Sequence, residues 1–156
     1  MFDIIVDTRE QQPWTFANVN GDIIDKIIYH KLDTGDYTIA GFEETLCIER
    51  KKSVAELANN ITDSRFDHEL SRMYEFRHKF LLLEFDYYNI DTYPIGSDIP
   101  KRLHKDIKIT GPYILKKLSE IAIQYDIHVI PCDNTSYAEM VAISLMKRIY
   151  ERYNKQ

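Results

Sequence analysis

The chain has 156 residues, of which 44% are hydrophobic and 29% charged, and its formal net charge is -5 at pH 7. This length and composition fit one domain with a single hydrophobic core. The longest apolar runs are too short to cross a bilayer, so we expect no membrane span. Nucleic-acid-binding domains usually carry a basic surplus that neutralises phosphates, and any such contact here must therefore depend on local basic clusters.

The N-terminus and the cysteines indicate where the protein works. The first residues have neither the basic stretch nor the small-residue cleavage site of a signal peptide. We therefore expect an intracellular protein, cytoplasmic if its source is prokaryotic or viral. Cys47 and Cys132 lie in apolar stretches without C-x-x-C spacing. We expect both to be reduced core residues rather than a disulfide or a metal-binding pair.

The first third of the chain is predicted to consist mainly of strands. Runs of β-branched and apolar residues between turn residues predict strands over residues 2–6, 26–32, 37–40 and 46–51. The last two of these strands form a hairpin around Gly41, and the polar segment 33–36 makes the turn before it.

Helices and strands alternate in the rest of the chain. Ser53 and Glu56 have the spacing of a capping box, which predicts a helix that starts there. A second helix is predicted over about 66–77, and the apolar run in 79–85 predicts a strand buried on both faces. Residues 86–110 contain proline and glycine, which predicts a long connection with at most a short helix. The last predicted elements are a helix led by Pro112, a strand over 127–131 and a helix over about 136–153.

This alternation predicts the fold class. We expect one α/β domain over residues 1–156, with a central mixed sheet and helices on both of its faces. The sheet should be antiparallel at the first hairpin and parallel later.

The hairpin holds the most informative residues. Side chains on a strand alternate between faces, so Glu49 and Lys51 point the same way while Arg50 points the opposite way. Asp36, in the turn that enters the hairpin, can reach the same pocket. Two carboxylates and an ammonium then meet at the end of a sheet. Hard cations favour such oxygen ligands, so the pattern predicts a Mg²⁺ site that Mn²⁺ can also occupy.

These residue types suit phosphodiester hydrolysis, which needs an activated water and relief of the charge on the phosphate oxygens. Lys51 would orient the water or help to deprotonate it, and the sequence leaves both roles open. Asp7 and Glu10, after the first strand, add acidic oxygens that would complete the site or hold a second cation. The alternatives are ordinary turn chemistry for Asp7 and Asp36, and a surface ion pair on an edge strand for Glu49 and Lys51.

Three segments together resemble the nuclease domain of the XPF family, a branch of the PD-(D/E)XK nucleases. They are Asp7-Thr8-Arg9-Glu10, Gly35-Asp36-Tyr37 and Glu49-Arg50-Lys51-Lys52. The segment 61–66, with Arg65, resembles a helix start of that family, and the strand and helix after residue 127 resemble its closing elements. The resemblance covers essentially the whole chain.

The resemblance implies a restriction-endonuclease-like fold and a Mg²⁺-dependent endonuclease that cuts DNA at branched or single-strand/double-strand junctions, in repair, recombination or replication. The alternative is a non-catalytic DNA-binding or scaffold subunit. We expect Asp7, Asp36, Glu49 and Lys51 to be catalytic, and the metal ligands to be Asp7, Asp36, Glu49 and the backbone carbonyl of Arg50. Arg9, Glu10 and Arg50 would support them. Two departures are the Ser64 that stands where the family commonly has glycine, and the expected lack of a helix-hairpin-helix module.

Two groups of basic residues are candidates for DNA contacts. Between residues 96 and 119, six basic residues outnumber two acidic ones, and a solvated helix face explains them equally well. From this stretch we expect backbone contacts by Lys101, Arg102, Lys105 and Lys108, in addition to Lys52. Arg65 is the first candidate for a phosphate contact, with a salt bridge at the helix start as the alternative. Trp14 is expected to anchor the first loop, and the alternative is stacking on a base.

The final helix suggests a partner. Tyr137, Val141, Leu145 and Ile149 have the spacing to cover the sheet, and further apolar residues, including Met146 and Tyr150, extend onto other faces. These extra apolar residues suggest a partner surface, and members of the XPF family that the chain resembles work as dimers. We therefore expect a homodimer or a complex with a protein that supplies DNA targeting. The alternative is a helix buried on several faces.

Overall fold

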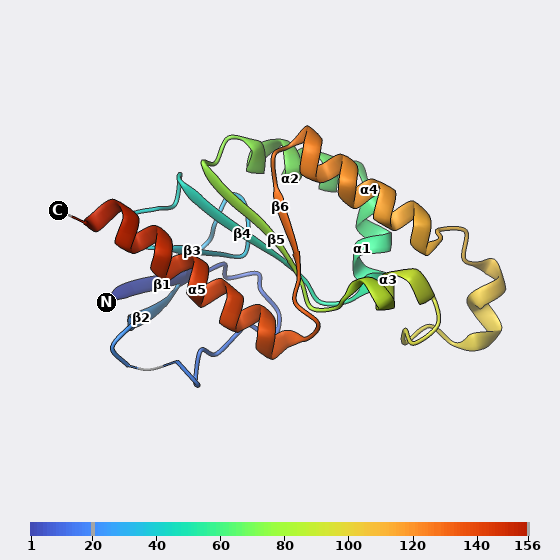
Figure 1. Ribbon diagram of the computed structural model, residues 1–156, viewed down its shortest axis with the longest axis horizontal. Coiled ribbons are helices and arrows are strands. Elements are labelled where there is room, and N and C mark those ends of the chain that lie inside the picture. Colours follow the sequence, from blue (N-terminus) through green and yellow to red (C-terminus); the bar gives the residue numbers. More distant parts are fainter. Residues whose placement is uncertain (20, 156) are drawn as a thin grey trace.

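The computed structural model describes residues 1–19 and 21–155, and its elements form one six-stranded mixed sheet flanked by helices (Figure 1). The strands are β1 (Phe2–Val6), β2 (Ile24–Tyr29), β3 (Tyr37–Ile39), β4 (Leu46–Lys51), β5 (His78–Leu83) and β6 (His128–Pro131). The helices are α1 (Val54–Ile61), α2 (Ser64–Tyr74), α3 (Tyr87–Thr92), the 3-10 helix η1 (Lys101–Asp106), α4 (Gly111–Gln124) and α5 (Thr135–Asn154). No helix in the described ranges has the length and apolar character that a membrane span needs.

The sheet confirms the predicted fold class. Its strand order is β2-β1-β3-β4-β5-β6. The pairs β1–β3 and β3–β4 are antiparallel, whereas β4–β5, β5–β6 and β1–β2 are parallel. All six residues of β4 are buried between β3 and β5. Glu49 and Lys51 therefore do not form a surface ion pair on an edge strand, and that alternative is wrong.

The start of α1 follows from its sequence with one difference. The Ser53 hydroxyl accepts a hydrogen bond from the Glu56 N–H at 3.1 Å, as an N-cap should. The Glu56 carboxylate, however, accepts from the N–H of Lys52 at 2.7 Å rather than from Ser53. Glu56 therefore holds the backbone of Lys52, in the short connection between β4 and α1 that directly follows Lys51.

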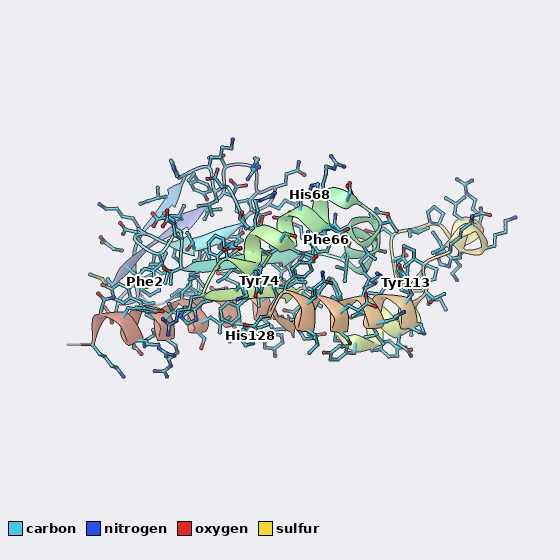
Figure 2. The ribbon with its side chains drawn as sticks, turned by 90° about the horizontal axis from the view of Figure 1, so that it is seen from above. Phe2, Phe66, His68, Tyr74, Tyr113 and His128 are labelled. Carbon is cyan, nitrogen blue, oxygen red and sulfur yellow. The ribbon has the colours of Figure 1, made fainter. Side chains whose placement is uncertain are left out.

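Two hydrophobic cores lie on opposite faces of the sheet. One core joins the sheet to α5, and the other joins the opposite face to α1, α2 and α4. In Figure 2, α2, marked by Phe66 and Tyr74, lies on the other side of the sheet from α5. Side chains alternate between the two faces along β1 and the residue after it. Ile4 and Val6 lie in the core with α5, so Asp7 points to the opposite face, where α2 lies.

The face of α5 that covers the sheet is only partly as predicted. Ile149 is buried, and Val141 and Leu145 pack against the core as expected, but Ala138, Ala142, Ile143 and Met146 are buried there too. Tyr137, which was expected to cover the sheet, is 53% exposed. Met146, which was expected to be surplus, is fully buried. The apolar residues of α5 therefore serve mainly the core, and they no longer support a partner surface that includes Met146.

The connection from residue 86 to 110 contains two short helices, α3 and η1, rather than at most one. Figure 1 shows that the yellow segment around η1 projects away from the sheet. The four basic residues Lys101, Arg102, Lys105 and Lys108 are all exposed there.

Candidate active site

Backbone hydrogen bonds bring the ends of β1, β3 and β4 together. The N–H of Asp7 donates to the carbonyl of Asp36 at 2.9 Å, and the N–H of Asp36 donates to the carbonyl of Ile48 at 2.8 Å. Gly35 makes this turn with a φ of 80°, where a Cβ atom would lie 2.5 Å from the sulfur of Cys47. Only glycine fits this position without strain, because the positive φ and the close approach both exclude a side chain. The turn thus sets Asp36 beside β4.

Glu49 and Lys51 share a buried pocket on the α2 face. Lys51 Nζ lies 3.0 Å from Glu49 Oε1, and both side chains are 6% exposed. Within the described residues, the other carboxylate oxygen of Glu49, Oε2, is buried and has no hydrogen-bond partner. A buried polar atom without a partner is rare in proteins and calls for a specific explanation.

The carboxylates of this pocket are electrostatically strained. Burial and then the charge of Glu10 raise the pKa of Asp36 to about 7, although the Arg50 N–H and Lys51 act in the opposite direction. Burial and the charge of Asp36 likewise raise the pKa of Glu49 well above its ordinary value. Burial lowers the pKa of Lys51, but the charge and hydrogen bond of Glu49 raise it more, so the net direction is upward. A bound cation would relieve the strain on both carboxylates.

Asp7 braces the end of β1. It is 4% exposed, and its Oδ1 atom accepts from the N–H of Leu32 at 2.9 Å. Its Oδ2 atom accepts from Arg9 Nε at 2.9 Å, and Arg9 Nη2 donates to the carbonyl of Leu32 at 2.6 Å. Asp7 and Arg9 therefore tie the segment before the hairpin to β1, and both line the pocket that holds Glu49.

Arg50 organises a buried network on the opposite face. Its Nε and Nη2 atoms donate to the two carboxylate oxygens of Glu84 at 2.6 and 3.1 Å, and Nη1 donates to Glu10 at 3.0 Å. The Trp14 indole N–H also donates to Glu84 at 3.0 Å, and its ring stacks on Tyr37 with centroids 4.3 Å apart. The structure thus places Glu10 with Arg50 and does not bring it into the pocket of Glu49.

The same network decides the role of Trp14. Its side chain is 2% exposed, so it anchors the first loop as expected, and the alternative of stacking on a nucleic-acid base is wrong. Glu84, at the end of β5, was not foreseen, because it pairs with a residue 34 positions earlier in the chain. Cys47 and Cys132 are buried and free, as expected.

The pocket of Glu49 is a cavity of about 410 Å³ with an acidic floor and a basic rim. Asp7, Asp36 and Glu49 reach it from the strand ends, and Glu69 reaches it from α2. The arginines that line it are Arg9, Arg65 and Arg72. Glu69 and Arg72 were not predicted as site residues from the sequence. Their spacing from Arg65, by four and seven residues, was the signal that could have placed all three on one face of a helix.

The donor set fits a hydrated cation better than a closed cage. In residues 1–19 and 21–155, no three His, Cys, Asp or Glu side chains come close enough to form a complete metal centre. Mg²⁺ usually keeps several waters and is held by one or two carboxylates. Asp36 and the unpaired oxygen of Glu49 provide such a pair of hard ligands, so the residues present fit this ion.

The residues predicted to bind DNA are spread over the structure. Arg65 lines the pocket, but its guanidinium pairs with Asp63 at 2.7 Å, which is the alternative that the sequence left open. The Lys52 ammonium donates to the carbonyl of Gln11. The basic residues of η1 lie outside the lining of this pocket.

The mixed six-stranded sheet with helices on both faces places the protein in the class of α/β proteins with a restriction-endonuclease-like fold. Residues 6–142 match the model of the ERCC4 domain, so the chain belongs to the ERCC4-domain family. Among solved structures, XPF from Aeropyrum pernix has a TM-score of 0.69 at 18% identity, over 98% of this chain and 67% of that one. The same protein in complex with DNA has a TM-score of 0.66 at 18% identity, over 97% of this chain and 66% of that one.

At 18% identity, the similarity to these structures shows a shared fold. Together with the ERCC4-domain match, it confirms the resemblance to the XPF family that the sequence indicated. The chain spans about two thirds of the length of the XPF chains that it matches. A search of curated proteins gave no match.

Proposed function

We propose that the chain is a Mg²⁺-dependent endonuclease, active also with Mn²⁺, that hydrolyses phosphodiester bonds in DNA. The observation that carries the proposal is the buried Oε2 atom of Glu49, which has no partner among the described residues. Glu49 lines an acidic pocket together with Asp36, and its other oxygen contacts Lys51. A carboxylate with a purely structural role would have partners for both oxygens, because a buried polar atom without a partner is unfavourable. Membership of the ERCC4-domain family supports the same activity.

The residues around Glu49 have separate roles in this proposal. Asp36 and Glu49 would hold the ion, with Asp7 and the backbone carbonyl of Arg50 next to them. When bound, the ion supplies charge to the phosphate oxygens and makes a bound water more acidic. Lys51, beside Glu49, would orient the water and offset negative charge, and the upward direction of its pKa in the metal-free protein favours this role over that of a base.

We place the substrate among branched DNAs and single-strand/double-strand junctions, with a role in repair, recombination or replication. The support is the similarity of the three sequence segments to the XPF family, together with the DNA complex of the Aeropyrum pernix protein. A homodimer or a targeting partner stays a prediction, and so does an intracellular location.

A substrate panel tests the activity. Labelled single-stranded, duplex, flap, fork and four-way DNA, with RNA as a comparison, are incubated with Mg²⁺, Mn²⁺ or a chelator. We expect cleavage of DNA with either metal and none with the chelator. Asp36→Asn and Glu49→Gln should abolish cleavage but retain DNA binding, whereas the exposed control Glu44→Gln should cut normally. DNA binding without cleavage across the panel would favour the non-catalytic subunit instead.

A further inference from the structure

One face of α2 carries an arginine, a glutamate and a second arginine over the pocket. Arg65, Glu69 and Arg72 are separated by four and three residues, which places them in one row along a helix. The buried side of the same helix, Phe66, Leu70 and Met73, packs into the core. This packing fixes the rotation of α2, so the row must face the pocket that it lines.

The three arginines of the pocket differ in how their charge is used. Arg9 is paired with Asp7, and the Arg65 guanidinium is paired through Nε and Nη2 with Asp63. Arg72 donates from Nε at 3.2 Å to the hydroxyl of Thr34, which is neutral. Throughout the described ranges, no carboxylate lies within 4.0 Å of the Arg72 guanidinium nitrogens, and its Nη1 and Nη2 atoms have no protein acceptor.

Thr34 gives the Arg72 guanidinium a defined orientation. Its side chain is buried, and it precedes the Gly35-Asp36 turn that forms one wall of the pocket. The hydrogen bond uses only Nε, so the other two nitrogens of the planar fork are left for a ligand with two oxygens. A backbone phosphate has this geometry, and a guanidinium binds it with two parallel hydrogen bonds.

We propose that Arg72 binds a backbone phosphate of the DNA strand in the pocket, next to the phosphate that is cleaved, and that Thr34 positions its guanidinium. The inference rests on the proposed function. Acidic residues outnumber arginines in the lining of the pocket by six to three, and a guanidinium at the rim with no carboxylate partner offsets part of this imbalance. Arg72, rather than Arg65, then provides the main positive charge there.

The test measures DNA affinity and its salt dependence, with Ca²⁺ in place of Mg²⁺ under conditions checked for the absence of cleavage. Arg72→Ala should weaken binding about tenfold, because it removes hydrogen bonds to a charged group. The log-log slope of affinity against salt should fall by about 0.7–0.9, the value for one phosphate contact. Arg72→Lys should keep the slope but bind more weakly than wild type, because it loses the two-pronged geometry. The exposed control Arg77→Ala should change neither quantity.

Thr34→Val separates positioning from charge. It keeps Arg72 but removes the acceptor of its Nε atom, so we expect a twofold to threefold loss of affinity, on the order of a weak hydrogen bond, with an unchanged slope. If Arg72→Ala is not folded by circular dichroism, Arg72→Gln removes the charge while its amide can still bond to Thr34. The expected fall in slope is the same.

The outcomes separate this inference from the proposed function. A wild-type protein that neither binds nor cuts DNA overturns both. A wild-type protein that cuts DNA, with a folded Arg72→Ala variant of unchanged affinity or unchanged salt slope, overturns the role of Arg72 alone.

Discussion

The N–H of Arg50 donates a 2.8 Å hydrogen bond to Oδ2 of Asp36. A strand in the middle of the sheet thus holds a carboxylate that comes from the turn before the hairpin. The side chain of Arg50 points to the other face, where it pairs with Glu84. One residue therefore orients the acidic pocket through its backbone and stabilises the opposite core through its side chain.

We predict that Gly35→Ala destabilises the protein and displaces Asp36. A Cβ atom there would collide with Cys47 and crowd the carbonyl of Ile48, in addition to the strain of a positive φ. Gly41→Ala is a matched control, because Gly41 also has a positive φ but its Cβ would meet nothing within 4 Å. Urea unfolding should show a loss of about 1 kcal/mol for Gly41→Ala and a clearly larger one for Gly35→Ala. Equal losses would contradict the steric argument.

The Arg50–Glu84 pair gives a second prediction. Glu84→Ala should lower the free energy of unfolding by about 3–5 kcal/mol, because it leaves the buried Arg50 guanidinium short of partners. The double variant Arg50→Met with Glu84→Ala should lose less than the sum of Arg50→Met and Glu84→Ala, since it removes both charges of this pair and leaves only Glu10 without its cation. Chemical denaturation of the four proteins measures this coupling. A Glu84→Ala variant as stable as the exposed control Glu44→Ala would refute it.

The local parts of the site could be predicted from sequence. The opposite directions of Arg50 and Glu49 follow from the period of a strand, and the cap at Ser53 depends on residues three positions apart. The pairing of Arg50 with Glu84 and the arrival of Glu69 at the pocket depend instead on how distant elements dock. No local pattern contains that information.

The error on α5 has a similar cause. A large apolar residue such as Tyr137 fits a hydrophobic stripe but is exposed, whereas the small Ala138 and Ala142 are among the residues buried against the sheet. Small side chains let the helix approach closely, and hydrophobicity alone does not reveal where closeness is needed. The parallel position of β2 beside β1, at the edge of the sheet, was likewise not predicted, because it depends on the path of the intervening loop.

Lys51 is predicted to act on the reaction and not on DNA affinity. Lys51→Met keeps most of the side-chain volume but removes the ammonium beside Glu49. Single-turnover cleavage should fall by about 10²-fold or more, in line with the loss of a group that positions a proton-transferring water. DNA affinity in Ca²⁺ should change little. An unchanged rate would remove Lys51 from the mechanism, and a loss of affinity as large as the loss of rate would show a binding role instead.

The last prediction concerns the stability of the metal-free protein against pH. The pKa of Asp36 is raised to about 7 by burial and by the charge of Glu10. A carboxyl group whose pKa is higher in the folded state stabilises that state only while it stays protonated there, so its contribution disappears as the pH rises from about 4 to about 7.

Asp36→Asn removes this loss, because an amide does not ionise. With a chelator at pH 8, the variant should therefore be more stable than wild type by roughly 1–3 kcal/mol, and the difference should shrink as the pH falls toward 4. The comparison cancels the titration of groups distant from Asp36, whereas Glu49, whose pKa the charge of Asp36 raises, contributes to the same difference. Thermal unfolding of both proteins across this pH range measures it, and added Mg²⁺ should stabilise wild type but not Asp36→Asn. A wild-type protein that is the more stable of the two at pH 8 without metal would show that Asp36 is not strained in the folded state.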